Sequence, residues 1–415
     1  MKLKIVKGTR DLYGDDIARF QYIEEKAREV FSIYGYEEIR NPIFEKTELF
    51  AHGVGEGTDI VGKEMYQLED RRGRSLALRP EGTAQVVRSV ITNNLMQQSS
   101  HRRFYYLGPM FRYEQPQKGR FRQFYQIGAE FFGVPTPDAD LELILVLRQF
   151  FKAIRLHDIS FHINTIGCQK PECRPAYKEK LIRFLKDHES DLCENCTRRM
   201  LDNPLRVLDC KNESCIAVTT DAPKIYEAIC SECADHFAEL QQLLAIHSVS
   251  YELNPRLVRG LDYYSRTVFE VFSDNLGAQN AAGGGGRYDG LFEIYGAKVV
   301  PSIGFALGLD RLALLIEPEK KEKKPVFVVG TDRQAVSRLV ANCREAGITC
   351  LYDPFQSSMK SQLRQTNKAG ASHALILGEE ELKEGKVSVK SMADGQQETI
   401  STEGVVEHLQ GLITG

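Results

Sequence analysis

Apolar residues near the start of the chain recur at spacings of three and four. This is the repeat of one face of an α-helix, and it runs from residue 15 to residue 34. Gly35 follows directly, and glycine is common just beyond a helix end. The pattern therefore predicts an amphipathic helix whose apolar face enters a core. Its apolar positions are Ile17, Phe20, Ile23, Ala27, Val30 and Phe31.

The chain up to residue 316 otherwise alternates short apolar runs with two longer patterns of helical period. Short runs rich in β-branched and aromatic residues are typical of strands. We therefore expect a strand-rich domain with helices packed beside its sheet. The expected strands lie near residues 42–44, 64–68, 76–79, 104–133, 251–253 and 267–272, and the expected helices at 86–95 and 139–156.

The pattern changes after residues 317–324, which are charged and have no large apolar side chain. Such a stretch is typical of a linker between domains. Residues 325–415 then alternate strand and helix patterns, and a βαβαβ order predicts a small, largely parallel sheet covered by helices. The expected strands are 326–329, 348–352 and 373–377, and the expected helices are 332–346 and 358–369.

The composition is that of an ordinary globular protein of two or three domains, with 415 residues, 42% of them hydrophobic and 27% charged. The net charge of −3 supplies no overall field for nucleic acid, so RNA contact needs a local basic patch. Residues 101–125 form one, with six Lys and Arg against the acid Glu114. The N-terminus lacks the apolar run of a secretory signal, and no stretch is long enough to span a bilayer. These features predict a cytoplasmic protein.

Eight of the ten cysteines lie between residues 168 and 233, in four pairs of x4 or x2 spacing. In a large cytosolic chain, such pairs argue against a disulfide framework. Paired thiolates suit tetrahedral zinc, and eight ligands can make two four-sulfur sites. The alternative is eight reduced thiols that only pack, and His236 is either a substitute ligand or a surface histidine. The expected ligands, within an inserted helical subdomain at 168–238, are Cys168, Cys173, Cys193, Cys196, Cys210, Cys215, Cys230 and Cys233.

Residues 104–133 carry a dense set of candidate binding groups. Arg112 and Glu114 are two apart, so on a strand they point to one face. A basic loop follows, and then a second run rich in Phe and Tyr. An antiparallel pair with arginines and carboxylates on one face can hold a phosphate and an amine together. The loop contains Gln117, Lys118, Gly119 and Arg120, and the second run carries Arg122, Gln126 and Glu130.

Residues 104–133 resemble motif 2 of the class II aminoacyl-tRNA synthetases, and in detail that of the histidyl-tRNA synthetase family. Residues 35–50 resemble motif 1, which implies the two-fold interface of a homodimer. The match covers nearly the whole chain, and the segment RGLDYY at 259–264 is highly specific. The other matching segments are GTRD at 8–11, LRPEGT at 78–83, AGGGGRYDGL at 282–291 and GFALGLDR at 304–311.

The resemblance implies the fold and activity of that family. The α+β catalytic domain, an antiparallel sheet flanked by helices, would comprise residues 1–167 and 239–316, and an α/β anticodon-binding domain residues 325–415. The activity would be that of a histidine–tRNA ligase, which uses ATP and Mg²⁺ to form histidyl-adenylate and pyrophosphate and then transfers histidine to the 3′ end of histidine tRNA.

Two other functions are considered. One is a regulatory paralogue of this fold in ATP phosphoribosyltransferase, an enzyme of histidine biosynthesis; such paralogues typically lack the anticodon-binding domain. The other is a generic nucleotide-binding α/β enzyme, but no phosphate loop follows Val329.

Two arginines are the catalytic residues that the resemblance implies. Arg112 and Arg259 would contact the α-phosphate of ATP from opposite sides, with Arg259 doing the work of a metal ion in related synthetases. Two guanidinium groups beside one phosphorus neutralise the charge that develops in the transition state. Glu114 would hold the adenine side of ATP, Arg120 the outer phosphates, and Arg311 both adenine and the γ-phosphate.

The resemblance also implies a histidine site in which two polar groups take the ammonium and two others take the imidazole nitrogens. Partners on both nitrogens reject side chains that lack either. The run Gly283–Gly286 is either a flexible turn or, as the resemblance suggests, a place where backbone packs tightly beside the substrate. The ammonium ligands would be Glu81 and Gln126, the imidazole ligands Glu130 and Tyr264, and the other site residues Thr83, Tyr263 and Tyr288.

The basic loop of motif 2 would approach the acceptor end of a tRNA. In the C-terminal domain, three basic residues four apart form a stripe on one helical face. A stripe of this kind is usually a solvated surface, and beside an RNA-binding domain it becomes a candidate for phosphate contact. The predicted tRNA contacts are Gln117, Lys118 and Arg122 in the first region and Lys360, Arg364 and Lys368 in the second.

Overall fold

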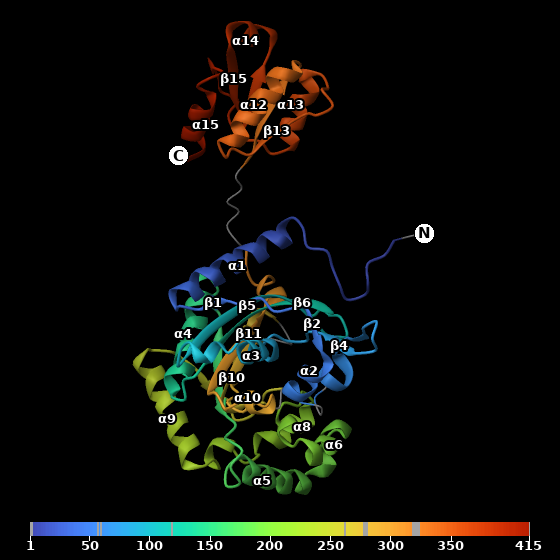
Figure 1. Ribbon diagram of the computed structural model, residues 1–415, viewed down its shortest axis with the longest axis vertical. Helices are drawn as coiled ribbons and strands as arrows, with labels where there is room; N and C mark the ends of the chain where they lie inside the picture. Colours follow the sequence, from blue (N-terminus) through green and yellow to red (C-terminus); the bar gives the residue numbers. More distant parts are fainter. Residues whose placement is uncertain are drawn as a thin grey trace. The chain divides into compact units, whose positions relative to one another are not determined.

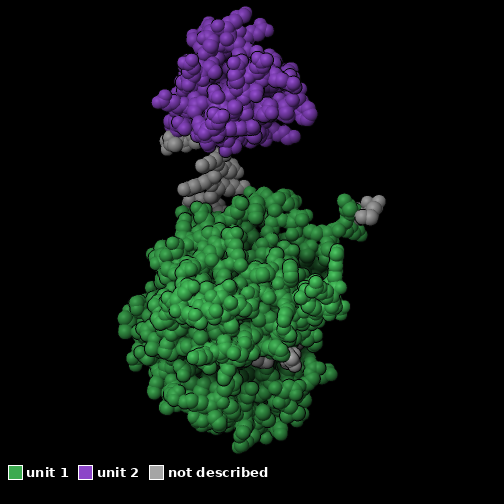
Figure 2. Space-filling view, viewed as in Figure 1, with its two compact units in different colours: residues 1–318 green, residues 319–415 purple. Residues whose placement is uncertain are grey.

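The computed structural model describes residues 3–55, 58, 60–117, 119–260, 263–276, 281–317 and 324–414. The chain forms two compact units, Met1–Pro318 and Glu319–Gly415 (Figure 2). Each unit has an apolar core of its own. The predicted linker falls almost wholly outside the described residues.

The first unit is built around an eight-stranded sheet (Figure 1). Its inner pairings are antiparallel, and a short parallel strand lies at each edge. The predicted antiparallel sheet flanked by helices is therefore confirmed. In spatial order the strands are β1 (Glu37–Glu38), β5 (Arg102–Phe111), β6 (Gln123–Phe132), β11 (Ser302–Gly308), β10 (Ala281–Arg287), β9 (Ser265–Phe272), β7 (Ser160–Thr165) and β8 (Glu252–Leu253).

The side chains of the central strands point alternately to the two faces of the sheet, and both faces are buried. On β5, Tyr105 packs in one core and Tyr106 in the other, and on β6 Phe131 and Phe132 divide in the same way. Successive side chains of a strand point to opposite faces, so both must be apolar when both faces are covered. This explains the nearly continuous aromatic runs of residues 104–133.

The first face of the sheet is covered by α1 (Asp15–Ile33), α4 (Pro137–Ala153) and α9 (Ser231–Ile246). The predicted N-terminal helix is confirmed, because α1 buries the apolar positions from Phe20 to Phe31 that the spacing indicates. Gly35 follows it with φ 73°. That is a left-handed conformation, which glycine adopts at little cost.

The opposite face is covered by α3 (Thr83–Thr92), α10 (Leu291–Ile294) and the helices that lie between residue 168 and the start of α9. Their apolar side chains share one core with Tyr263, Tyr264 and Tyr288. The cysteine-rich segment therefore packs directly against residues predicted to bind histidine. Before α9 its helices are α5 (Arg174–Asp187), α6 (Glu194–Asp202), α7 (Leu205–Leu208) and α8 (Glu213–Thr220).

A small antiparallel sheet lies beside α2 (Thr47–Val54). It consists of β2 (Phe44–Lys46), β4 (Ser75–Leu78) and β3 (Gln67–Glu69). β2 and β3 begin later than predicted, because hydrogen bonding to β4 determines where each strand starts. Residues Ile60–Glu64 form a turn of π-helix instead of the start of a strand.

The second unit is a five-stranded sheet with helices. The expected strands and helices are present, but the prediction of a largely parallel sheet is wrong, because two of its four pairings are antiparallel. The missed hairpin consists of β15 (Lys386–Ser391) and β16 (Gln397–Ser401). Both strands are short and mostly polar, so the alternation of apolar residues along them is weak. The elements are β12 (Val326–Gly330), α12 (Arg333–Glu345), β13 (Cys350–Tyr352), α13 (Met359–Lys368), β14 (His373–Leu377), α14 (Glu379–Glu384), β15 (Lys386–Ser391), β16 (Gln397–Ser401) and α15 (Val405–Thr414).

Across the described part of both units, no helix combines the length and the apolar character that a membrane crossing requires.

Candidate active site

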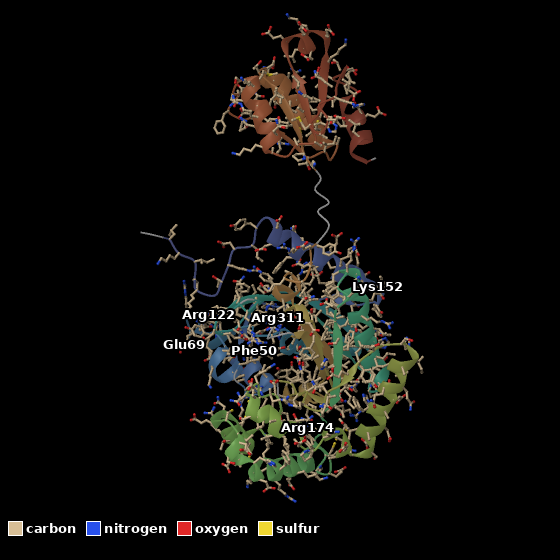
Figure 3. The ribbon with its side chains drawn as sticks, turned by 180° about the vertical axis from the view of Figure 1, so that it is seen from behind. Phe50, Glu69, Arg122, Lys152, Arg174 and Arg311 are labelled. Atoms are coloured by element: carbon tan, nitrogen blue, oxygen red, sulfur yellow. The ribbon has the colours of Figure 1, made fainter. Side chains whose placement is uncertain are left out.

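A cavity of the first unit is lined by β6, β9, β10 and β11 and by the segments that precede β6 and β9. Its wall brings together residues far apart in the sequence, including Arg112 and Arg259. Of the residues predicted to bind histidine or ATP, all but Glu130 and Tyr288 line it. Those in the wall are Glu81, Thr83, Arg112, Glu114, Arg120, Gln126, Arg259, Tyr263, Tyr264 and Arg311 (Arg311 is labelled in Figure 3).

The glycine run forms the middle of β10, so a flexible turn is wrong. Gly283 and Gly284 line the cavity. A Cβ atom on Gly284 would lie 2.5 Å from the carbonyl oxygen of Phe269 and 2.8 Å from Nη1 of Arg259. The run therefore lets neighbouring strands and the Arg259 side chain approach the backbone closely.

Arg112 and Glu114 follow the end of β5 at Phe111, so the expectation that they lie on a strand is wrong. They nevertheless reach the same cavity. The Arg112 Nε donates to the carbonyl oxygen of Pro80 at 2.9 Å, which fixes the base of its guanidinium. Arg120 Nη1 donates to Glu114 Oε2 at 3.1 Å, so the loop residue folds back over the site.

Arg259 is held by a residue that the sequence analysis did not select. Its Nη1 donates to Glu270 Oε1 at 2.9 Å, and its guanidinium lies 5.8 Å from the ring centre of Tyr264. Glu270 is on β9 between Phe269 and Val271, which are buried in the other face of the sheet. A charged residue inside a predicted strand was the available signal.

The arginine end of the cavity is suited to an anion. Burial, followed by the positive charge of Arg120, lowers the pKa of the Arg311 guanidinium. The lining itself shows the crowding of cations: it carries four arginines at this end, with Glu114 and Glu270 as the nearby acids. A polyphosphate would relieve the crowding, since arginine pairs readily with phosphate oxygens.

The other end of the cavity is suited to an ammonium and a polar ring. Glu81 accepts from the backbone amides of Thr83 at 2.7 Å and Ala84 at 2.9 Å. Gln126 Oε1 is buried and has no hydrogen-bond partner among the described residues. A buried acceptor without a partner is costly, so a ligand donor at this position would be favourable.

Glu130 and Tyr288 lie behind this end of the wall rather than in it. Thr83 Oγ1 donates to one carboxylate oxygen of Glu130 at 2.7 Å, and the Tyr288 hydroxyl donates to the other. Gly304 provides the space, because a Cβ there would lie 1.6 Å from Glu130 Oε2. Burial raises the pKa of Glu130 to about 8, although both hydrogen bonds oppose the shift.

This raised pKa predicts how stability depends on pH. A carboxyl whose pKa is higher in the folded state makes its full contribution to the free energy of unfolding when the pH is below its unfolded pKa, which is about 4.3 for Glu. This contribution is lost as the pH rises towards the folded pKa of about 8. We expect wild type to lose up to about 1.4 kcal/mol per pH unit relative to Glu130→Gln across that window. Urea unfolding of both proteins between pH 5 and 8 measures this; a constant difference contradicts it.

Those predicted tRNA residues that the structure describes do not line the cavity. Gln117 pairs with Arg120 in an isolated bridge, and Lys118 lies outside the described residues. The guanidinium of Arg122 (labelled in Figure 3) lies 3.8 Å from the ring centre of Tyr113, and Arg122 is not part of the wall. The stripe of Lys360, Arg364 and Lys368 is exposed on α13.

The eight clustered cysteines form two groups of four. Within each group all sulfur atoms lie within 4.8 Å of one another. The basal quartet unites the first and last pairs, and the distal quartet the two middle pairs. Their members are Cys168, Cys173, Cys230 and Cys233 in the basal quartet, and Cys193, Cys196, Cys210 and Cys215 in the distal quartet.

Sulfur spacing in both quartets fits a tetrahedral metal. A zinc–sulfur bond of about 2.3 Å places neighbouring sulfurs about 3.8 Å apart. The distance from Cys168 Sγ to Cys230 Sγ is 3.8 Å, and that from Cys193 Sγ to Cys210 Sγ is 3.9 Å. All ten cysteines of the chain are free thiols.

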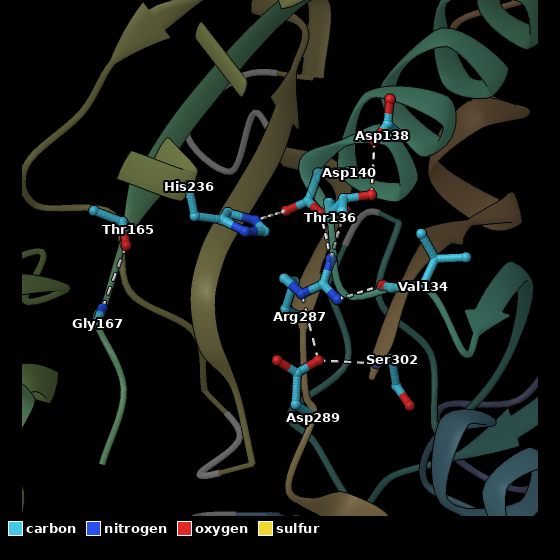
Figure 4. Close-up of polar contacts among 10 residues, drawn as sticks. All are labelled: Val134, Thr136, Asp138, Asp140, Thr165, Gly167, His236, Arg287, Asp289 and Ser302. Atoms are coloured by element: carbon cyan, nitrogen blue, oxygen red, sulfur yellow. Dashed lines mark hydrogen bonds and ion pairs between the residues drawn. The ribbon is translucent and has the colours of Figure 1, made fainter. Parts of the chain in front are cut away.

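His236 is neither a member of these quartets nor a surface histidine, so both expectations for it are wrong. It is buried on α9, and its Nε2 lies 3.2 Å from Oδ1 of Asp140 (Figure 4). Arg287 Nη1 donates to the other oxygen of Asp140, and Arg287 Nη2 donates to the carbonyl of Val134 at 2.7 Å. Burial would raise the pKa of Asp140, but the Arg287 charge and the His236 hydrogen bond hold it below its usual value.

Comparison with known proteins agrees with this geometry. The family model described as histidyl-tRNA synthetase matches residues 8–312, and the one described as anticodon binding domain matches residues 323–412. The histidine–tRNA ligase of Maridesulfovibrio salexigens is 48% identical over 96% of this chain and 98% of its own length. That of Halothermothrix orenii is 45% identical over the full length of both chains.

Solved structures give the same result. The crystal structure of apo histidyl-tRNA synthetase from S. aureus matches with a TM-score of 0.81 and 33% identity, covering 98% of this chain and 99% of that chain. The predicted fold class and ligase activity are confirmed, and the regulatory paralogue is not favoured because the curated ligases match through the C-terminal domain. The chain therefore belongs to the histidyl-tRNA synthetase family.

Proposed function

We propose that this protein activates L-histidine with ATP in the cavity of the first unit and transfers it to histidine tRNA. The observation that carries the proposal is the convergence of Arg112 and Arg259 on one cavity, beside a buried acceptor at Gln126. The arginines suit a reacting phosphate, and the acceptor suits an ammonium. ATP enters as its magnesium complex.

The two ends of the cavity divide the work of activation. Arg112 and Arg259 flank the α-phosphate and stabilise the charge that develops as the histidine carboxylate displaces pyrophosphate. Arg120 takes the outer phosphates, and Glu114 and Arg311 hold the adenine and the γ-phosphate. Enclosure of both reactants in one cavity supplies the alignment that an in-line attack needs.

At the other end, Glu81 and Gln126 accept the histidine ammonium. The imidazole lies among Thr83, Tyr263 and Tyr264, with the Glu130–Tyr288 pair behind it. When histidine binds, an imidazole nitrogen replaces the Tyr288 hydroxyl as the hydrogen-bond partner of Glu130. The Glu130 carboxyl then recognises the ring directly. Two oriented polar partners then select a ring with two nitrogens.

ATP–pyrophosphate exchange tests the function. We expect exchange with L-histidine to exceed that with each of the other nineteen amino acids, and the purified protein to charge histidine tRNA. Exchange with a different amino acid, or binding of histidine without exchange, would contradict the proposal.

Residues 1–167 and 239–316 form the catalytic domain of this proposal, residues 168–238 an insertion, and residues 325–415 the anticodon-binding domain. The motif 2 loop with Gln117 approaches the acceptor end of the tRNA, while the stripe Lys360, Arg364 and Lys368 contacts its phosphates. Arg122, stacked on Tyr113, positions the loop.

A homodimer through residues 35–50 accounts for apolar side chains that the single chain leaves exposed. Ile43 and Phe44 are 43% and 56% exposed, and Leu68 on β3 of the same small sheet is 42% exposed. Adjacent exposed apolar residues are typical of an interface. Sedimentation equilibrium measures the stoichiometry, for which we expect two chains.

We also propose that each cysteine quartet holds one zinc ion. Zinc binding needs reduced thiols, and we propose that the protein is cytoplasmic, where thiols stay reduced. Cys173 and Cys230 occupy the position directly before α5 and α9, and Cys193 the position directly before α6. Helix N-termini favour negative charge, and a zinc ion with four thiolates carries a charge of −2. Amides of Cys168 and Cys193 donate to quartet sulfurs at 3.3 and 3.2 Å.

Metal analysis of protein purified without chelator tests this. We expect two zinc ions per chain, one in Cys196→Ser and still two in Cys343→Ser, because Cys343 is buried in the core of the second unit and belongs to neither quartet. Protein without stoichiometric zinc would refute the proposal.

A further inference from the structure

We propose that the zinc-loaded basal quartet positions the histidine pocket, through Arg174 on α5 and His236 on α9. The inference rests on the activity and the zinc occupancy proposed above. Arg174 and His236 are positioning residues, since each acts on the pocket through another residue.

The basal quartet joins the two ends of the inserted segment. Cys173 directly precedes α5, and Cys230 directly precedes α9. The backbone amides of Cys168 and Cys230, 62 positions apart, both donate to Cys173 Sγ, at 3.3 and 3.4 Å. A metal at this point therefore fixes the start of α5 relative to the start of α9.

The α5 end is attached to the histidine pocket by Arg174, the residue next to Cys173 (labelled in Figure 3). Its side chain is buried and donates to three carbonyl oxygens: Ile166 at 2.8 Å, Gly167 at 2.9 Å and Tyr264 at 2.7 Å. Tyr264 lines the cavity. The guanidinium thus ties the backbone of a pocket residue to the strand end that leads into the quartet.

The α9 end is attached to the same pocket by His236, three residues after Cys233. His236 contacts Asp140, and Asp140 receives the buried guanidinium of Arg287 (Figure 4). The residue after Arg287 is Tyr288, which donates to Glu130. One quartet is consequently linked to both Tyr264 and the Tyr288–Glu130 pair.

The phosphate end has different supports. Arg112 is held by Pro80, and Arg311 Nη1 donates to the carbonyl of Ala281. Arg259 is a shared point, since it donates to Glu270 and its guanidinium also lies near the Tyr264 ring. Loosening the basal quartet should therefore weaken histidine binding more than ATP binding. A substitution that only lowered the amount of folded enzyme would lower the apparent kcat and leave the KM values for histidine and ATP unchanged.

The test uses full-length, zinc-loaded protein in ATP–pyrophosphate exchange. Arg174→Met removes the three hydrogen bonds while leaving every cysteine in place. We expect two zinc ions to be retained, the KM for histidine to rise about tenfold and the KM for ATP to change less than about twofold. Arg174→Lys should restore part of the histidine affinity. The matched control is Arg183→Met, since Arg183 is 79% exposed on the same helix and should leave all values unchanged.

A second arm tests the metal directly. Cys233→Ser should retain one zinc ion and raise the KM for histidine in the same way. An unchanged KM for histidine in zinc-loaded Arg174→Met, or equal rises in both KM values, would overturn the inference. Wild type that holds no zinc would overturn it together with the metal proposal. If wild type shows no exchange, the proposed function fails instead, and calorimetric binding of histidine to wild type and Arg174→Met still measures the positioning effect.

Discussion

Arg259→Ala is expected to reduce histidine-dependent ATP–pyrophosphate exchange by about a thousandfold, the scale seen when an arginine on a transferring phosphorus is lost. Arg259 lines the cavity, its Nη1 donates to Glu270 at 2.9 Å, and its side chain approaches Gly284 closely. Its guanidinium is therefore already oriented before ATP binds. Pre-steady-state measurement of adenylate formation gives the size of the effect.

Two variants control this experiment. Arg259→Lys keeps the charge and loses the fork, so it should recover only part of the rate. Arg183→Ala removes an exposed arginine of the insertion and should leave the rate unchanged. Thermal unfolding of Arg259→Ala should stay close to wild type. Exchange at a near wild-type rate in that variant would refute the role of Arg259.

Deletion of residues 325–415 is expected to spare exchange and to reduce charging of histidine tRNA by about a hundredfold, which corresponds to about 3 kcal/mol of lost tRNA binding. The whole activation cavity lies in the first unit, which has its own cores. The second unit matches an anticodon binding domain. Comparison of exchange and charging rates for the truncated and full-length proteins measures this.

Replacement of Lys360, Arg364 and Lys368 together by alanine should give an intermediate loss of charging that grows with salt, because these residues contact phosphates in the proposed complex. A matched triple variant at Lys178, Lys180 and Arg183 on α5 provides the control for lost positive charge. Equal loss of exchange and charging in the truncated protein would contradict the separation of the two steps.

The sequence by itself determined the elements whose signals are local. The spacing of apolar residues identified α1 and the alternation in the second unit, because helix and strand periods are properties of neighbouring positions. The motif segments identified the family, and they contain nearly all the residues of the cavity wall. Paired cysteines indicated zinc chemistry, since knuckle spacing is also local.

Only the tertiary structure decided which distant groups meet. It sorted four cysteine pairs into two quartets, joined Glu270 to Arg259, and turned His236 from a supposed ligand or surface residue into a buried partner of Asp140. It also placed Glu130 behind the cavity wall, where burial alters its pKa. These contacts depend on how separate strands and helices pack around a common core, and periodicity carries no information about that packing.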